Sequence, residues 1–146
     1  MTKLEKLYQK AHDAEIDIYD RRISKGKKAI CFYYDSDKTI AMDREAIASV
    51  FEETELLAEE IGHYETDALY MIEATANTPS ARSNRLKCEA RAKKWAVRHV
   101  LPVEDICKAA GKGCRMNYEM AEELGVTTDF LDYAINYYVS KNELVI

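Results

Sequence analysis

Residues 59–63 have the sequence E-E-I-G-H, and their types and spacing are suited to metal chemistry. Residues four apart on a helix lie on one face, so Glu59 and His63 should point the same way. In the zinc-peptidase motif H-E-x-x-H, two histidines at this spacing bind the metal and the glutamate after the first is the general base. Here Glu60 matches that glutamate, but Glu59 replaces the first histidine. The segment indicates a metal site with one exchanged ligand, a site that has lost its metal, or an ordinary solvated helix face.

A strongly amphipathic helix is expected to carry this motif. Asp43 is suited to cap its first turn, because an aspartate side chain can accept a hydrogen bond from a free backbone amide. One apolar stripe should pack on a sheet. This stripe contains Ile47, Val50, Leu57 and Ile61.

Three short apolar segments predict that sheet. Residues 29–34 and 39–42 are separated by the polar turn 35–38, which indicates a hairpin, and residues 16–19 supply a third strand. Before them, residues 3–14 place apolar side chains at helical spacing, which predicts an opening helix.

A second long helix is expected from near Ser80 to Val100, ending before Pro102. Ala92 and Ala96 lie on one face and would let another helix approach closely, and Glu89 on the same face would then point toward that helix. This face contains Glu89, Ala92, Lys93, Ala96 and Val100.

The remaining segments are a connection and a helical C-terminal part. Residues 66–84 show no clear helical pattern, and the apolar run 68–72 followed by Pro79 suggests a strand and then a loop. Beyond Pro102, three short helices are expected at 103–110, 117–124 and 128–139.

The composition is that of a globular protein. The chain has 146 residues, of which 47% are hydrophobic and 32% charged, and it fits a single domain over 1–146. Its net charge of −5 disfavours a general nucleic-acid binder, and no apolar run is long enough to cross a membrane. The N-terminus lacks a signal-peptide pattern and the four cysteines form no C-x-x-C pair, so we expect a cytoplasmic protein with mostly buried, inert thiols.

Two segments taken together resemble the ImmA/IrrE family of metallo-endopeptidases. The first is L-A-E-E-I-G-H-Y at 57–64, and the second is E-A-R-A-K-K-W-A at 89–96, followed by Pro102. The resemblance implies an α+β, zincin-like core over 1–102. In it a small three-stranded antiparallel or mixed sheet packs on the active-site helix, and a second helix carries a further ligand. Residues 103–146 would then form a helical C-terminal extension.

The resemblance also implies the roles of individual residues. Glu59, His63 and Glu89 would bind the metal, and Glu60 would be the catalytic base. Zn²⁺ is the expected ion, with Mn²⁺ or Fe²⁺ less favoured, although oxygen-rich ligation suits these harder ions better. Two carboxylates and one neutral imidazole cancel the charge of a divalent ion, which predicts a weaker Lewis acid and a slower peptidase than two histidines and one glutamate would give.

Other side chains near the motif have alternative roles. Asp67 follows His63 by four residues and could replace Glu59 or Glu89 as a ligand. Tyr64 and Tyr70 could donate to an oxyanion, although packing is the favoured interpretation because tyrosine is abundant in this chain. Gly62 indicates close packing, since glycine inside a helix costs about 1 kcal/mol relative to alanine.

Family analogy suggests that the chain cleaves a helix-turn-helix transcriptional repressor, as an antirepressor of a phage or mobile element. The alternative is an inactive, metal-free relative that binds a repressor or another protein without cutting it. A third class is a DNA-binding regulator, because residues 120–128 resemble the start of a helix-turn-helix unit. This class is disfavoured, since the following segment 129–138 carries Asp129 and Asp132 but no Lys or Arg. The oligomeric state is left open.

Overall fold

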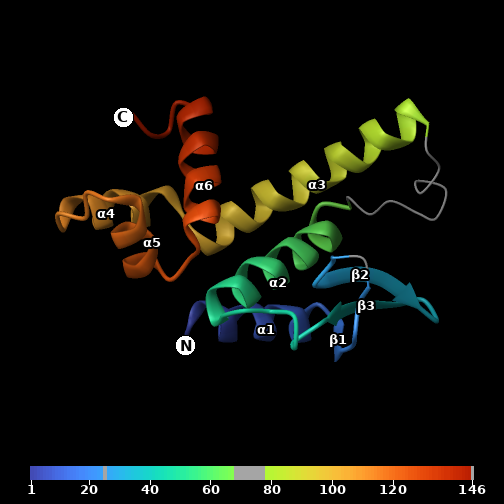
Figure 1. The fold of residues 1–146 in the computed structure, drawn as a ribbon. Coiled ribbons are helices and arrows are strands. Elements are labelled where there is room, and N and C mark those ends of the chain that lie inside the picture. Colours follow the sequence, from blue (N-terminus) through green and yellow to red (C-terminus); the bar gives the residue numbers. More distant parts are fainter. Residues whose placement is uncertain (25, 68–77, 146) are drawn as a thin grey trace.

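A small mixed sheet forms beside the first helix in the N-terminal part of the chain (Figure 1). The computed structural model describes residues 1–24, 26–67 and 78–145. Helix α1 (Lys3–Asp13) precedes strands β1 (Asp17–Asp20), β2 (Ala29–Tyr34) and β3 (Asp37–Met42). The strand order is β1-β3-β2, with β2 antiparallel and β1 parallel to β3, so β2 is an edge strand. The predicted hairpin and third strand are confirmed.

Helix α2 (Val50–Glu65) packs against the sheet but begins later than the sequence suggested. Ser49 caps it by accepting a hydrogen bond from the Glu52 amide at 3.1 Å. The prediction that Asp43 caps this helix is wrong, because its carboxylate accepts a hydrogen bond from the Ile23 amide at 3.0 Å instead. Val50 is 61% exposed and therefore lies outside the buried stripe, whereas Leu57 and Ile61 are fully buried.

Helix α3 (Pro79–Val100) packs alongside α2 (Figure 1). Thr78 caps it through the Ala81 amide, and the helix ends before Pro102 as expected. A Cβ atom added at Gly62 would lie 2.7 Å from the carbonyl oxygen of Ala92, nearer than real Cβ atoms come to such an atom. The predicted close approach of two helices through small residues is confirmed.

Three shorter helices complete the described chain: α4 (Val103–Gly111), α5 (Asn117–Leu124) and α6 (Thr128–Ser140). Gly125 ends α5 with a φ of 71°, a conformation that glycine adopts without strain. Helix α6 buries Leu131 and Tyr138 in the same hydrophobic cluster as the sheet and α2, and the Tyr138 hydroxyl donates to the Leu101 carbonyl at 2.9 Å. These contacts give α6 a packing role in the core.

The architecture is therefore α+β, with α2 placed between the sheet on one side and α3 on the other (Figure 1). The strand suggested at 68–72 lies outside the described residues. Within residues 1–24, 26–67 and 78–145, no helix combines the length and apolarity needed to cross a membrane.

Candidate metal site between α2, α3 and β2

The C-terminal half of α2 directs its polar side chains into the protein and not into solvent. His63 is only 4% exposed and Glu60 is half-buried, although both lie on the face that could have been an ordinary charged surface. Helix α3 covers this part of α2, since Gly62 allows the two backbones to approach. The interpretation of this segment as a solvated helix face is therefore wrong.

His63 and Glu89 meet across the contact between α2 and α3. Nε2 of His63 lies 3.5 Å from Oε1 of Glu89. A direct charge-assisted hydrogen bond would be shorter, at about 2.7–2.9 Å. For comparison, two ligands of one tetrahedral zinc ion, each about 2.0–2.1 Å from the metal, are separated by roughly 3.4 Å. The observed spacing thus suits two ligands of the same ion.

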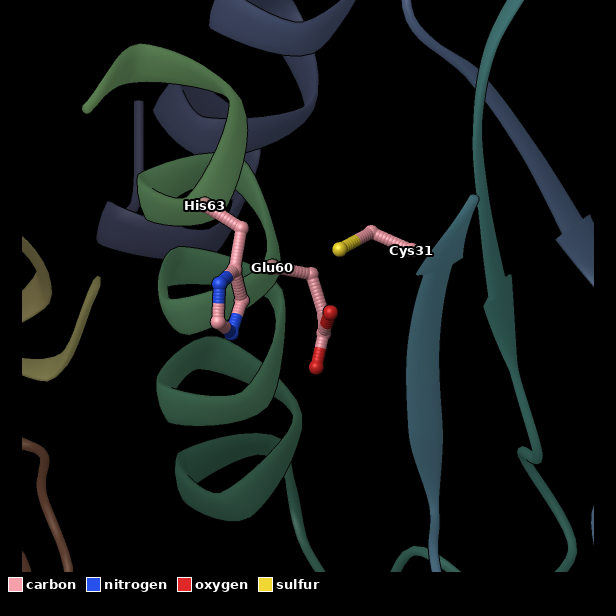
Figure 2. A group of neighbouring side chains, drawn as sticks. All are labelled: Cys31, Glu60 and His63. Carbon is pink, nitrogen blue, oxygen red and sulfur yellow. The ribbon is translucent and has the colours of Figure 1, made fainter. Parts of the chain in front are cut away.

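Glu60 is directed toward the edge strand. Figure 2 shows its carboxylate between the helix and β2, together with the imidazole of His63 and the thiol of Cys31. Ligand atoms of these three residues lie within 4.8 Å of one another. The Cys31 thiol therefore lies close to the Glu60 carboxylate. The structure therefore places nitrogen, oxygen and sulfur donors in one small space.

Glu59 lies in the same electrostatic neighbourhood. Burial raises the pKa of its carboxyl group to about 7, and the negative charges of Glu60 and Glu89 act in the same direction. The positive charge of Lys93 on α3 opposes this shift more strongly than His63 does. Glu59 does not belong to the compact group formed by Cys31, Glu60 and His63.

Burial is also the main reason that the pKa of Glu60 is raised. The charge of His63 and the hydrogen bond from Cys31 lower this pKa, whereas the charge of Glu89 raises it. Three carboxylates thus lie near one imidazole in a partly buried place, where the charges of neighbouring carboxylates disfavour the ionised forms of Glu59 and Glu60. A divalent cation bound there would relieve this repulsion.

The donor set fits a metal of the zinc type. Zinc is bound in proteins by imidazole nitrogen, carboxylate oxygen and thiolate sulfur, and all three are present. His63 and Glu89 would hold the ion, with Glu60 beside them. Placement of Glu59 as a further ligand stays a prediction from the sequence.

Tyr64 has a structural role. It is 7% exposed, and its hydroxyl donates to the backbone carbonyls of Thr39, at 2.7 Å, and Phe32, and accepts from the Thr39 amide at 2.9 Å. These contacts attach α2 to the β2–β3 hairpin and confirm the favoured packing interpretation. Tyr70, the other oxyanion candidate, lies outside the described residues. Asp67 is exposed just beyond the end of α2 and is not part of the Cys31 group.

Cys31 was not recognised from the sequence as a site residue. The sequence feature that could have indicated Cys31 is the alternation of side chains along β2, which places residues 29, 31 and 33 on one face. Tyr33 makes an edge-to-face ring contact with Tyr64 of α2, so this face is the one turned toward the helix. The sequence, however, contains nothing that positions β2 opposite Glu60.

No family model matches the chain, and comparisons with curated proteins and with solved structures found no match.

Proposed function

We propose that this chain is a metal-dependent endopeptidase whose site lies between α2, α3 and β2. The observation that carries the proposal is the 3.5 Å approach of His63 Nε2 to Glu89 Oε1, from two different helices and at the spacing of two ligands of one ion. Zn²⁺ is the proposed ion, with Mn²⁺ and Fe²⁺ less favoured. The nearby imidazole and thiol donors support this choice of ion.

Each residue has a separate part in the proposed reaction. A divalent metal, when bound, supplies a Lewis acid that polarises a peptide carbonyl and makes water more acidic. His63 and Glu89 hold it, and the buried position of His63 fixes its ring. Glu60 takes the proton of the attacking water and delivers it to the leaving amine. Burial raises its pKa above the ordinary value, which brings this carboxylate nearer to the proton affinity that suits a base at neutral pH.

The proposed substrate is a helix-turn-helix transcriptional repressor. This choice rests on the resemblance of residues 57–64 and of residues 89–96 to the corresponding segments of the ImmA/IrrE family. A metal-free protein that binds such a repressor without cutting it is the competing function, and metal content separates the two.

The test combines metal analysis with a cleavage assay. Purified protein is reconstituted with zinc, dialysed and measured by elemental analysis, with about one zinc per chain expected from a single four-ligand site. A fluorogenic peptide library and a panel of helix-turn-helix repressors then serve as substrates. Glu60→Gln should retain zinc and lose cleavage, whereas Glu65→Gln, a change of an exposed glutamate on the same helix, should retain both. A folded protein without zinc would contradict the proposal, as would undiminished cleavage by Glu60→Gln.

A further inference from the structure

Cys31 is the one member of the compact donor group that the proposed reaction does not use. It lies in the middle of β2, paired with Ile40 of β3, so the hairpin fixes the direction of its side chain. Figure 2 shows its sulfur pointing from the strand toward α2, on the part of the helix that carries Glu60 and His63. All three donor atoms lie within 4.8 Å of one another. Thiolate and imidazole ligands of one tetrahedral zinc ion are separated by about 3.5 Å, so the donor atoms lie near the spacing that a common ion requires.

The other cysteines do not share this environment. Cys88 and Cys114 are half-buried and Cys107 is exposed. Over the described ranges 1–24, 26–67 and 78–145, the group around Cys31 is the single cluster of three or more potential metal ligands. A matched thiol elsewhere in the chain, Cys114, therefore provides an internal comparison.

We propose that Cys31 is itself a metal ligand, and that its thiolate, together with His63 and Glu89, completes a sulfur, nitrogen and oxygen donor set. This inference rests on the proposed metal site. In this inference Cys31, on the edge strand β2, is the third ligand in place of Glu59, which the sequence resemblance implied. With three protein ligands a tetrahedral ion keeps one open position, which is the arrangement of catalytic zinc sites.

The proton that this step releases has a nearby acceptor. When the metal binds, the Cys31 S–H bond breaks, a sulfur–metal bond forms, and one proton is released. The Glu60 carboxylate lies within 4.8 Å of this thiol, so it is placed to receive the proton and pass it to solvent. The thiolate, the Glu89 carboxylate and a neutral His63 then cancel the two positive charges of the ion.

A thiolate ligand also changes the expected metal preference. Oxygen-rich ligation favours Mn²⁺ and other hard ions, whereas a sulfur ligand favours zinc and cobalt. Glu59 is then free to serve as a counter-charge for Lys93, whose positive charge already acts on it.

Cobalt titration tests the role of Cys31 independently of catalysis. Reduced, metal-free protein is titrated with Co²⁺, which gives visible bands in any tetrahedral site and a near-ultraviolet charge-transfer band only with a thiolate ligand. Wild type and Cys114→Ser should show both bands. Cys31→Ser should lose the charge-transfer band and bind Co²⁺ at least tenfold more weakly, by analogy with the 10- to 100-fold effects of weaker perturbations around metal sites.

The possible failures are distinguishable. Visible bands without a charge-transfer band in wild type would overturn the role of Cys31 and leave the metal site intact. Persistence of the charge-transfer band in Cys31→Ser would also overturn it. No cobalt or zinc binding by folded wild type would overturn the proposed function and this inference together.

Zinc protection of the wild-type thiols gives a second test, which does not require any variant to fold. Alkylation by iodoacetamide is mapped by mass spectrometry with and without Zn²⁺. Zinc should slow the modification of Cys31 and leave that of Cys114 unchanged. Equal alkylation of Cys31 in both conditions would overturn the inference.

Discussion

Replacing Gly62 by alanine should separate the two helices that form the proposed site. The new Cβ would lie 2.7 Å from the Ala92 carbonyl oxygen and 3.3 Å from the Ala92 carbonyl carbon. Both are backbone atoms of α3, so the contact can be relieved only by moving one helix away from the other. Overpacking of this kind costs about 1–3 kcal/mol, and a contact with backbone atoms belongs at the upper end of that range.

The intrinsic preference of alanine for helices acts in the opposite direction. Alanine is favoured over glycine inside a helix by about 1 kcal/mol, which offsets part of the cost. The net expectation is a loss of about 2 kcal/mol in the free energy of unfolding. For a domain of this size that corresponds to a fall in Tm of about 4–8 °C.

Urea denaturation followed by circular dichroism measures this change, and Gly111→Ala is the matched control. Gly111 is also helical, in α4, but nothing lies within 4 Å of a Cβ atom added there. The control should be neutral or more stable, by up to about 1 kcal/mol. If Gly62→Ala were as stable as wild type or more so, the proposed close contact of α2 with α3 would be refuted. Because the same movement separates His63 from Glu89, zinc binding should weaken in Gly62→Ala and not in the control.

Three further predictions follow from other contacts. Tyr64→Phe should lower the free energy of unfolding by about 1–3 kcal/mol, measured in urea, because it removes the partner of buried backbone groups. Burial raises the pKa of Tyr64 to about 12, above its value of 10.0 in an unfolded chain, so its contribution is complete below pH 10 and is lost as pH rises toward 12. The fall in wild-type stability over that range should be smaller in Tyr64→Phe, and an equal fall would contradict the assignment. Glu55→Ala should lower the free energy of unfolding, measured by thermal denaturation, by about 1–3 kcal/mol. The Glu55 carboxylate accepts hydrogen bonds from the amide and the hydroxyl of Thr127, each at 2.7 Å. Unchanged stability would show that this link between α2 and the start of α6 contributes little free energy. Glu59→His should tighten zinc binding about tenfold or more in a chelator competition, since it adds an imidazole donor one helical turn before His63, and weaker binding would count against a site on this face of α2.

Local patterns in the sequence were sufficient to predict most of the secondary structure. The predicted ranges of the strands and of the helices after Pro102 agree with the structure within a few residues, because apolar spacing and turn residues act over short distances. The start of α2 could not be predicted in this way. Asp43 has the side chain of a cap, but its carboxylate is used by the Ile23 amide, which is brought near only by the tertiary fold.

The sequence by itself determined that Glu59, Glu60 and His63 share a helix and that Gly62 marks a close contact. It also placed Glu89 on the small-residue face of the second helix. Only the tertiary structure decided which groups approach these side chains. Glu89 and Lys93 approach them from α3, and Cys31 approaches them from β2.

The physical reason is that helical periodicity fixes directions within one element and says nothing about what lies opposite. Cys31 and Glu60 belong to elements joined by a hairpin and a long connection, and their approach depends on the packing of β2 against α2. The potential ligands on α2 could therefore be predicted from the spacing of its residues. The sulfur donor, Cys31, could be identified only from the packing of β2 against α2.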